Sequence, residues 1–79
     1  MVIDVRIATS AATGATRVAI DIPEGATARE LVTALIRDGH LAAQAEGTAL
    51  VAVDGQVCGE DETIAAGQDC AILLPAAGG

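Results

Sequence analysis

A single helical pattern, placed between segments that alternate like strands, restricts the fold of this chain more than any other feature. Thr27-Ala28-Arg29-Glu30 matches a capping box, in which the Thr27 hydroxyl accepts from the amide of Glu30 and the Glu30 carboxylate accepts from the amide of Thr27. The apolar residues after it recur at helical spacing: Leu31, Val32, Leu35 and Ile36. Gly39 is the expected left-handed residue after a helix of about three turns. One apolar stripe needs one apolar surface to cover it.

Strand patterns lie on both sides of this helix. Residues 1–8 and 17–22 alternate between apolar and polar side chains around a loop that contains Gly14, which predicts an antiparallel hairpin. Residues 41–46 favour a short helical turn, and the β-rich run 48–53 leads into a second hairpin. The turn of that hairpin is Asp54-Gly55, and its short return strand is 56–58. Gly67-Gln68-Asp69 predicts a turn before a last strand over 70–74.

The order of these elements predicts the topology. The first and last strands can lie side by side in parallel, because the segment between them contains the crossover helix. We therefore expect an α+β chain with the β-grasp fold, a mixed sheet of four to five strands curled over one main helix. Residues 1–75 form the predicted domain and residues 76–79 a flexible C-terminal tail.

Composition excludes several classes of function. The 79 residues carry a net charge of −7 with four arginines and no lysine, which disfavours nucleic-acid binding and fits either solubility or docking to a basic surface. No apolar run is long enough for a membrane span and no signal-peptide pattern begins the chain, so a cytoplasmic protein without membrane contact is expected. Without Phe, Tyr or Trp, the core must be aliphatic.

The cysteines and the single histidine do not form a metal-site pattern. Cys58 and Cys70 are too few for an iron–sulfur cluster, and with His40 alone a zinc site is poorly supplied. We expect Cys58 and Cys70 to be two small buried hydrophobic residues and His40, just past the helix, to be a capping or surface imidazole. The acidic run 60–62 lacks the spacing of an oxygen-ligand cage and is predicted to be a surface cluster.

The C-terminus carries the chemical signal. The last strand is followed by Pro75, a short spacer and Gly78-Gly79, so the terminal carboxylate sits on a stalk without side chains. Glycine adopts dihedral angles that other residues avoid and can pass through narrow openings. Such an end suits another enzyme that activates the carboxylate, whereas a featureless frayed terminus is the alternative.

With this tail, the chain resembles the ubiquitin-like sulfur carriers, and most closely the small subunit of molybdopterin synthase. The similar segments are 50–55, a strand and turn, and 72–79, the last strand and tail. Two features depart from that pattern. The family usually has an aromatic residue or two, and this chain has none; Ala76 stands where a second proline is common.

The resemblance implies a carrier rather than a free-standing enzyme. An E1-like adenylating enzyme would use ATP to activate the carboxylate of Gly79, and a sulfur donor would convert it to a thiocarboxylate. The large subunit of a molybdopterin synthase would receive the sulfur, and the chain itself would bind no cofactor or metal. Gly78, Ala77 and Pro75 would contact the partners, together with Leu73, an apolar side chain expected to be exposed beside the tail.

Other functions remain open. The same tail serves carriers for thiamine, cysteine or specialised sulfur-containing metabolites. It would also suit a ubiquitin-like protein modifier, in which Gly79 is joined to a lysine of a target. A binding module without tail chemistry is a third class, because the β-grasp is a common scaffold.

Overall fold

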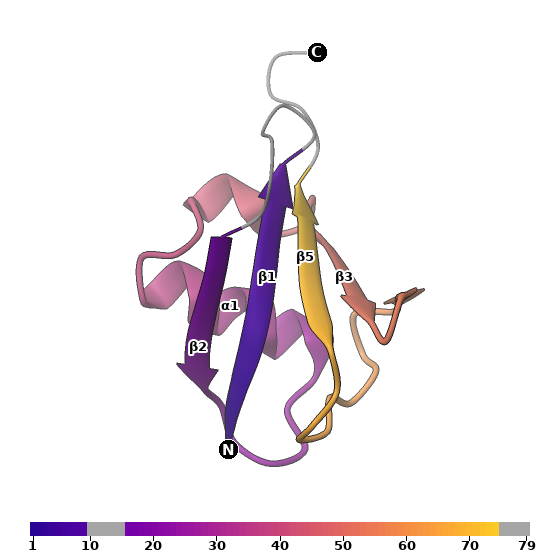
Figure 1. Cartoon of the computed structure of the whole chain (residues 1–79). Helices are drawn as coiled ribbons and strands as arrows, with labels where there is room; N and C mark the ends of the chain where they lie inside the picture. Colours follow the sequence, from indigo (N-terminus) through magenta and orange to yellow (C-terminus); the bar gives the residue numbers. More distant parts are fainter. Residues whose placement is uncertain (10–15, 75–79) are drawn as a thin grey trace.

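The computed structural model describes residues 1–9 and 16–74, which fold into one sheet and one main helix (Figure 1). Their bounds along the chain are β1 Val2–Thr9, β2 Thr16–Asp21, α1 Ala28–Arg37, the 3₁₀ turn η1 Ala43–Ala45, β3 Leu50–Val53, β4 Gln56–Cys58 and β5 Cys70–Leu74. The predicted order of elements is confirmed.

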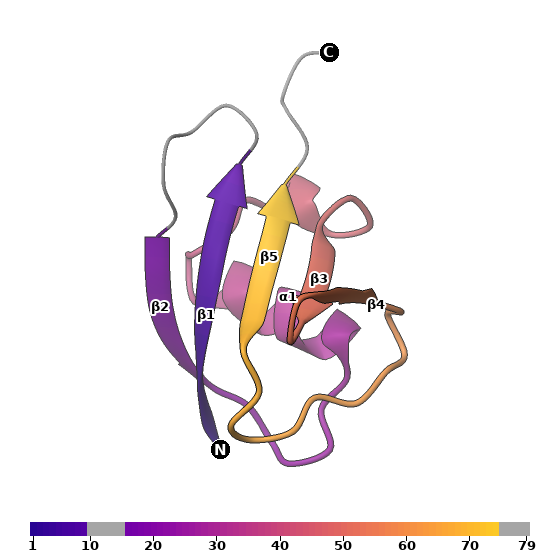
Figure 2. The same ribbon diagram turned by 45° about the vertical axis from the view of Figure 1, so that its right-hand side comes forward.

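The five strands form a single mixed sheet in the order β2-β1-β5-β3-β4. β1 and β5 run parallel at its centre, and every other neighbouring pair is antiparallel. α1 crosses one face of this sheet, and β5 lies between β1 and β3 (Figure 2). This is the β-grasp arrangement, so the predicted α+β fold class is correct.

The capping box predicted at the start of α1 is present. The Glu30 amide donates to the Thr27 hydroxyl at 3.3 Å, and the Thr27 amide donates to the Glu30 carboxylate at 2.9 Å. Asp38 caps the other end, and Gly39 has the expected positive φ of 83°. The helix begins and ends where its local signals place it because these contacts lie within a few residues of each end.

The Asp54-Gly55 turn fixes the start of β5 as well as the β3–β4 hairpin. Both residues have positive φ, 52° and 86°, as a two-residue type I′ turn requires. The Asp54 amide donates to the carbonyl of Asp69 at 2.8 Å, and the Asp69 amide donates to Asp54 Oδ1 at 2.9 Å. Asp54 therefore ties the β3–β4 hairpin to Asp69, the residue immediately before β5.

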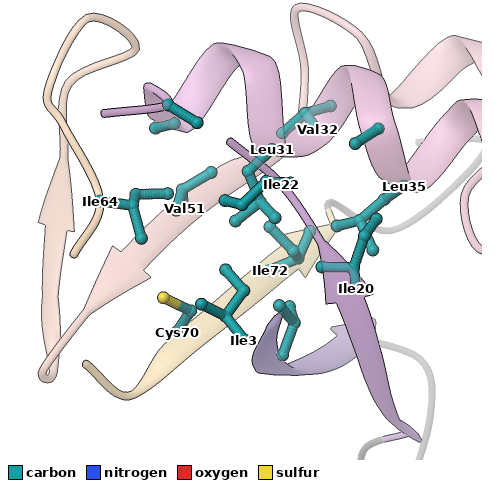
Figure 3. Packing of buried hydrophobic residues seen from close by; sticks show 14 of the residues in the cluster. Ile3, Ile20, Ile22, Leu31, Val32, Leu35, Val51, Ile64, Cys70 and Ile72 are labelled. Carbon is teal, nitrogen blue, oxygen red and sulfur yellow. The ribbon is translucent and has the colours of Figure 1, made fainter. Parts of the chain in front are cut away.

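The core is aliphatic, as the missing aromatic residues demand, and it lies between α1 and the inner face of the sheet (Figure 3). Ile64, from the segment before β5, fills one end of it and is 1% exposed. Ile7, Val18 and Ile36 fall on the apolar side of the alternating and helical patterns, but they are only half-buried. Val18 lies on an edge strand, and Ile7 and Ile36 lie near the ends of their elements, where fewer neighbours can cover them.

No helix among the described residues combines the length and the hydropathy that crossing a membrane requires. The longest helix there, α1, has 10 residues.

Candidate functional site: the outer face beside the last strand

β5 delivers the C-terminal segment from the centre of the sheet. Its side chains alternate strictly: Cys70 and Ile72 point into the core and are fully buried, whereas Ala71 and Leu73 point to the opposite face. Leu73 is 40% exposed, as predicted. Because β5 is bonded to a neighbour on each side, its position is rigidly held up to the point where the strand ends at Leu74.

Leu73 is part of a larger apolar surface that we call the outer apolar patch. In the sheet register, Leu73 lies beside Ala8 of β1 and directly opposite Leu50 of β3, which is 51% exposed. The next row along the strands contains Ala71, Ala52 and Val57. The patch therefore comprises six residues from four strands: Ala8, Leu50, Ala52, Val57, Ala71 and Leu73. Two large leucines meet on this face of the sheet beside the last residues of β5.

Arginines border the patch on the β1–β2 side. Arg6 lies beside Ala71 in the register, and Arg17 of β2 lies directly opposite Arg6. Arg6 is paired with Asp69 at 2.7 Å, and both side chains are about half exposed. Two of the four arginines of an acidic chain thus lie on the outer face. A partner surface that combines apolar groups with carboxylates would match it.

The remaining predicted site residues follow β5 directly. Pro75, Ala77, Gly78 and Gly79 lie outside the described residues, so their contacts and the predicted boundary between domain and tail stay predictions. β5 ends at Leu74, immediately before Pro75, in agreement with the inability of proline to donate to a strand ladder.

Comparison with known proteins identifies the family. The model of the ThiS family matches residues 5–79. The chain belongs to the ThiS family. Comparison with curated proteins gave no match.

Two solved structures share the fold of this ThiS-family chain. SAMP1 from Haloferax volcanii has a TM-score of 0.69 and 22% identity, covering 96% of this chain and 99% of that one. A ubiquitin from Caldiarchaeum subterraneum has a TM-score of 0.66 and 17% identity, with complete coverage of both chains. At these identities the likeness is one of fold. With the family match, it makes the protein a ubiquitin-like sulfur carrier or modifier.

The thiols are poorly suited to carry the sulfur in this family member. Burial raises the pKa of Cys70, and nearby Asp54 and Asp69 raise it further. Burial also raises the pKa of Cys58, with a contribution from Glu62. Cys70 is buried, as predicted. Cys58 was expected to be buried too, but it is only half-buried, because it ends a three-residue edge strand and borders a hollow of about 270 Å³ beside α1. Both thiols are held in the protonated, weakly nucleophilic form.

The acidic run 60–62 is a surface cluster, as predicted. Two of its carboxylates, those of Glu60 and Asp61, form ion pairs with Arg29 in the first turn of α1, at 2.9 and 3.5 Å. Within residues 1–9 and 16–74, no group of three or more potential metal ligands is close enough to hold an ion.

Sequence reasoning found Leu73 but missed the other members of the outer apolar patch. Leu50, Ala52 and Val57 alternate with inward residues of their own strands, and this pattern was visible in the sequence. What was missing was the register that sets Leu50 opposite Leu73. The signal that could have found the patch is an apolar residue at an outward position on several neighbouring strands at once.

Proposed function

We propose that this ThiS-family protein is the sulfur carrier of molybdopterin biosynthesis and acts through Gly79. An E1-like enzyme joins the Gly79 carboxylate to AMP from ATP and releases pyrophosphate. Sulfide from a sulfur donor then displaces AMP, so the carbon–oxygen bond to the phosphate breaks and a carbon–sulfur bond forms. Within the synthase large subunit, the thiocarboxylate sulfur bonds to a carbon of a cyclic pyranopterin phosphate and displaces an oxygen there. Water then hydrolyses the resulting thioester, which leaves the sulfur on the pterin and returns Gly79 as a carboxylate.

The observation that carries this proposal is the position of β5. A central, fully bonded strand leads into the glycine tail, and the outer apolar patch lies on the exposed face of that strand and its neighbours. A partner bound to the patch would therefore sit beside the point where Leu74 leaves the sheet. Docking on the outer face of the sheet and chemistry at the terminus are supplied by neighbouring parts of the sequence, so the chain can place its terminus in a partner's active site without reactive side chains of its own.

The choice of molybdopterin among the sulfur pathways rests on two segments. The strand and turn over residues 50–55 and the end of the chain over 72–79 resemble the small subunit of molybdopterin synthase. In the structure the first segment forms β3 and its turn, and β3 pairs directly with β5. β3 and the described part of the second segment, residues 72–74, thus lie side by side on the part of the sheet that presents the patch.

The test is reconstitution. The full chain, ATP, a sulfide source and the E1-like enzyme should yield a product heavier by the difference between sulfur and oxygen, with the change located in the terminal peptide. Deletion of Gly79 should abolish it, and Gly78→Val should reduce it severely because a branched side chain restricts the glycine path. Gly59→Val is the matched control, since a Cβ there meets only Glu62 Cγ at 3.9 Å. Sulfur found on a cysteine, or full activity without Gly79, would refute the proposal.

The pathway is tested separately from the carrier chemistry. Thiocarboxylated protein should convert cyclic pyranopterin phosphate to molybdopterin when the synthase large subunit is added. Sulfur transfer to a thiazole or cysteine precursor in parallel reactions, without molybdopterin formation, would assign the carrier to thiamine, cysteine or specialised metabolism instead.

A protein modifier is the second candidate, favoured by the fold shared with SAMP1 and a ubiquitin. Activated Gly79 would then form an isopeptide bond with a lysine of a target. The chain contains no lysine, so its own side chains offer no amine for self-conjugation and chain building. Mass spectrometry of cell proteins for lysines that carry the C-terminal peptide of this chain distinguishes this role from sulfur transfer.

A further inference from the structure

The long edge of the sheet is formed by β2. β2 spans six residues, Thr16–Asp21, and pairs only with β1, whereas the opposite edge strand β4 has three. No other described strand or helix lies alongside β2 within the sheet, where it forms one margin in Figure 2. Such an edge presents backbone donors and acceptors to another strand.

The hydrogen bonds next to β2 show which of its backbone groups face outward. Met1 and Ile22 exchange both bonds, with N···O distances of 2.7 and 2.8 Å. Hydrogen-bonded and non-bonded pairs alternate along an antiparallel ladder, so Ile20 and Val18 also bond to β1. The N–H and C=O groups of the residues between them therefore point to the open edge. These residues are Arg17, Ala19 and Asp21.

The side chains of the same three residues form a self-complementary series. All three are exposed on the outer face, in the order positive, small, negative. If a second β2 is laid antiparallel with Ala19 opposite Ala19, each Arg17 lies opposite an Asp21 of the other copy. The outward-facing backbone groups then form three hydrogen-bonded pairs. Moving the register by two residues either way sets Arg17 or Asp21 opposite Ala19 and loses both ion pairs.

Arg17 also has an electrostatic reason to accept a carboxylate from outside. Within the sheet, Arg17 lies directly opposite Arg6 of β1, and like charges directly opposite one another are unfavourable. Arg6, Arg29 and Arg37 each have a carboxylate partner. Arg17 has none within residues 1–9 and 16–74. Asp21 is 80% exposed, and among the described residues its carboxylate is bonded only to the N-terminal amine at 3.2 Å, so it can accept from a second cation.

We propose that β2 is the interface of a symmetric homodimer, in which two copies of this chain pair antiparallel through β2 with Ala19 at the two-fold axis. The two sheets join into one, and Val18, half-buried at present, packs beside Ile20 of the other copy on the inner face. Because the copies run in opposite directions, the two β5 strands end at opposite ends of the joined sheet. The dimer therefore leaves both outer apolar patches and both strand ends accessible.

The experiment is sedimentation equilibrium of the full chain over a concentration series up to about 1 mM, at about 0.15 M salt to screen the general repulsion between two acidic chains. The mass should rise from 7.8 kDa toward twice that value. Arg17→Asp and Asp21→Arg should each weaken dimerisation roughly tenfold or more, since each replaces two attractive pairs by two repulsive ones. Arg37→Asp, with the same charge change on α1, should have no effect.

Two further arms test the register and the backbone pairing. An equal mixture of the Arg17→Asp and Asp21→Arg variants should dimerise again. Each mixed dimer contains two pairs of opposite charge across the interface, whereas each variant alone has only like-charged pairs there. Ala19→Pro should give a folded monomer, since the lost N–H faces the open edge rather than β1. A mass of 7.8 kDa at every concentration would overturn the proposal. Dimers that tolerate Arg17→Asp, Asp21→Arg and Ala19→Pro would also overturn it. So would an equal mixture of the two charge variants that stays monomeric.

Discussion

The substitution Leu73→Asp separates partner docking from folding. Fully burying a leucine side chain contributes about 1.5–3 kcal/mol, and 40% of Leu73 remains exposed for a partner to cover, so its apolar share of docking is about 1 kcal/mol. Aspartate loses this share and also places a carboxylate in an apolar contact, at a further cost of about 1–3 kcal/mol. The sum, about 2–4 kcal/mol, corresponds to a roughly 30- to 1000-fold weaker Kd for the E1-like enzyme.

The fold should tolerate the same change. Leu73 points away from the core, and within the chain the substitution mainly removes its cross-strand packing against Leu50, worth about 0.2–1 kcal/mol. For a domain of this size that lowers Tm by at most about 4–8 °C. Leu73→Ala should give an intermediate result, about fivefold in Kd, because it removes apolar area without adding charge.

Isothermal titration of the E1-like enzyme with each variant measures the effect, and thermal unfolding by circular dichroism checks the fold. Val2→Asp is the matched control. Val2 is also apolar and on the outer face, and at 66% it is more exposed than Leu73. It lies at the start of β1, whereas Leu73 lies beside Ala8 near the end of that strand. If Leu73→Asp binds within about twofold of the unmodified chain, or if Val2→Asp loses as much affinity, the outer apolar patch is not the docking surface.

Two further predictions concern stability and the thiols. Thr27→Ala removes the hydroxyl that accepts from the Glu30 amide and should destabilise the domain by about 1 kcal/mol, visible as a lower Tm; Thr33→Ala, in mid-helix, is the control, and equal losses would contradict a capping role. Cys58→Ala and Cys70→Ala should retain sulfur transfer. Because their pKa values are raised, alkylation of the folded chain should accelerate only above the usual pH range of a thiol, with Cys58 reacting first. Rapid labelling of Cys70 near neutral pH would contradict this.

The helix and the hairpin turn could be predicted because their determinants are local. The capping box spans four residues, and Asp54-Gly55 sets its own turn type. The start of β3 was less predictable, and the expected strand began two residues too early. Thr48 and Ala49 donate their amides to the carbonyl of Ala45 and so continue the η1 turn, which keeps them out of the sheet.

The patch and the edge could not be predicted in the same way, because both depend on pairing between distant segments. Alternation along each strand shows that Leu73 and Leu50 face away from the core, but only the register between β3 and β5 places them opposite one another. Similarly, Arg17 is a plain polar position in the sequence. Its importance appears when Arg6 is found opposite it and β2 is found at the margin of the sheet.

The two faces of β5 divide stability from recognition. Cys70 and Ile72 are fully buried and hold the strand in the core, while Ala71 and Leu73 on the other face are available to partners. A substitution on the outer face can therefore abolish docking in a chain that still folds, whereas one on the inner face affects both. This separation would suit the carrier role proposed above, in which the chain needs to bind one partner after another without a change of fold. A rigid central strand meets that need, because docking requires no rearrangement of the sheet that presents the terminus.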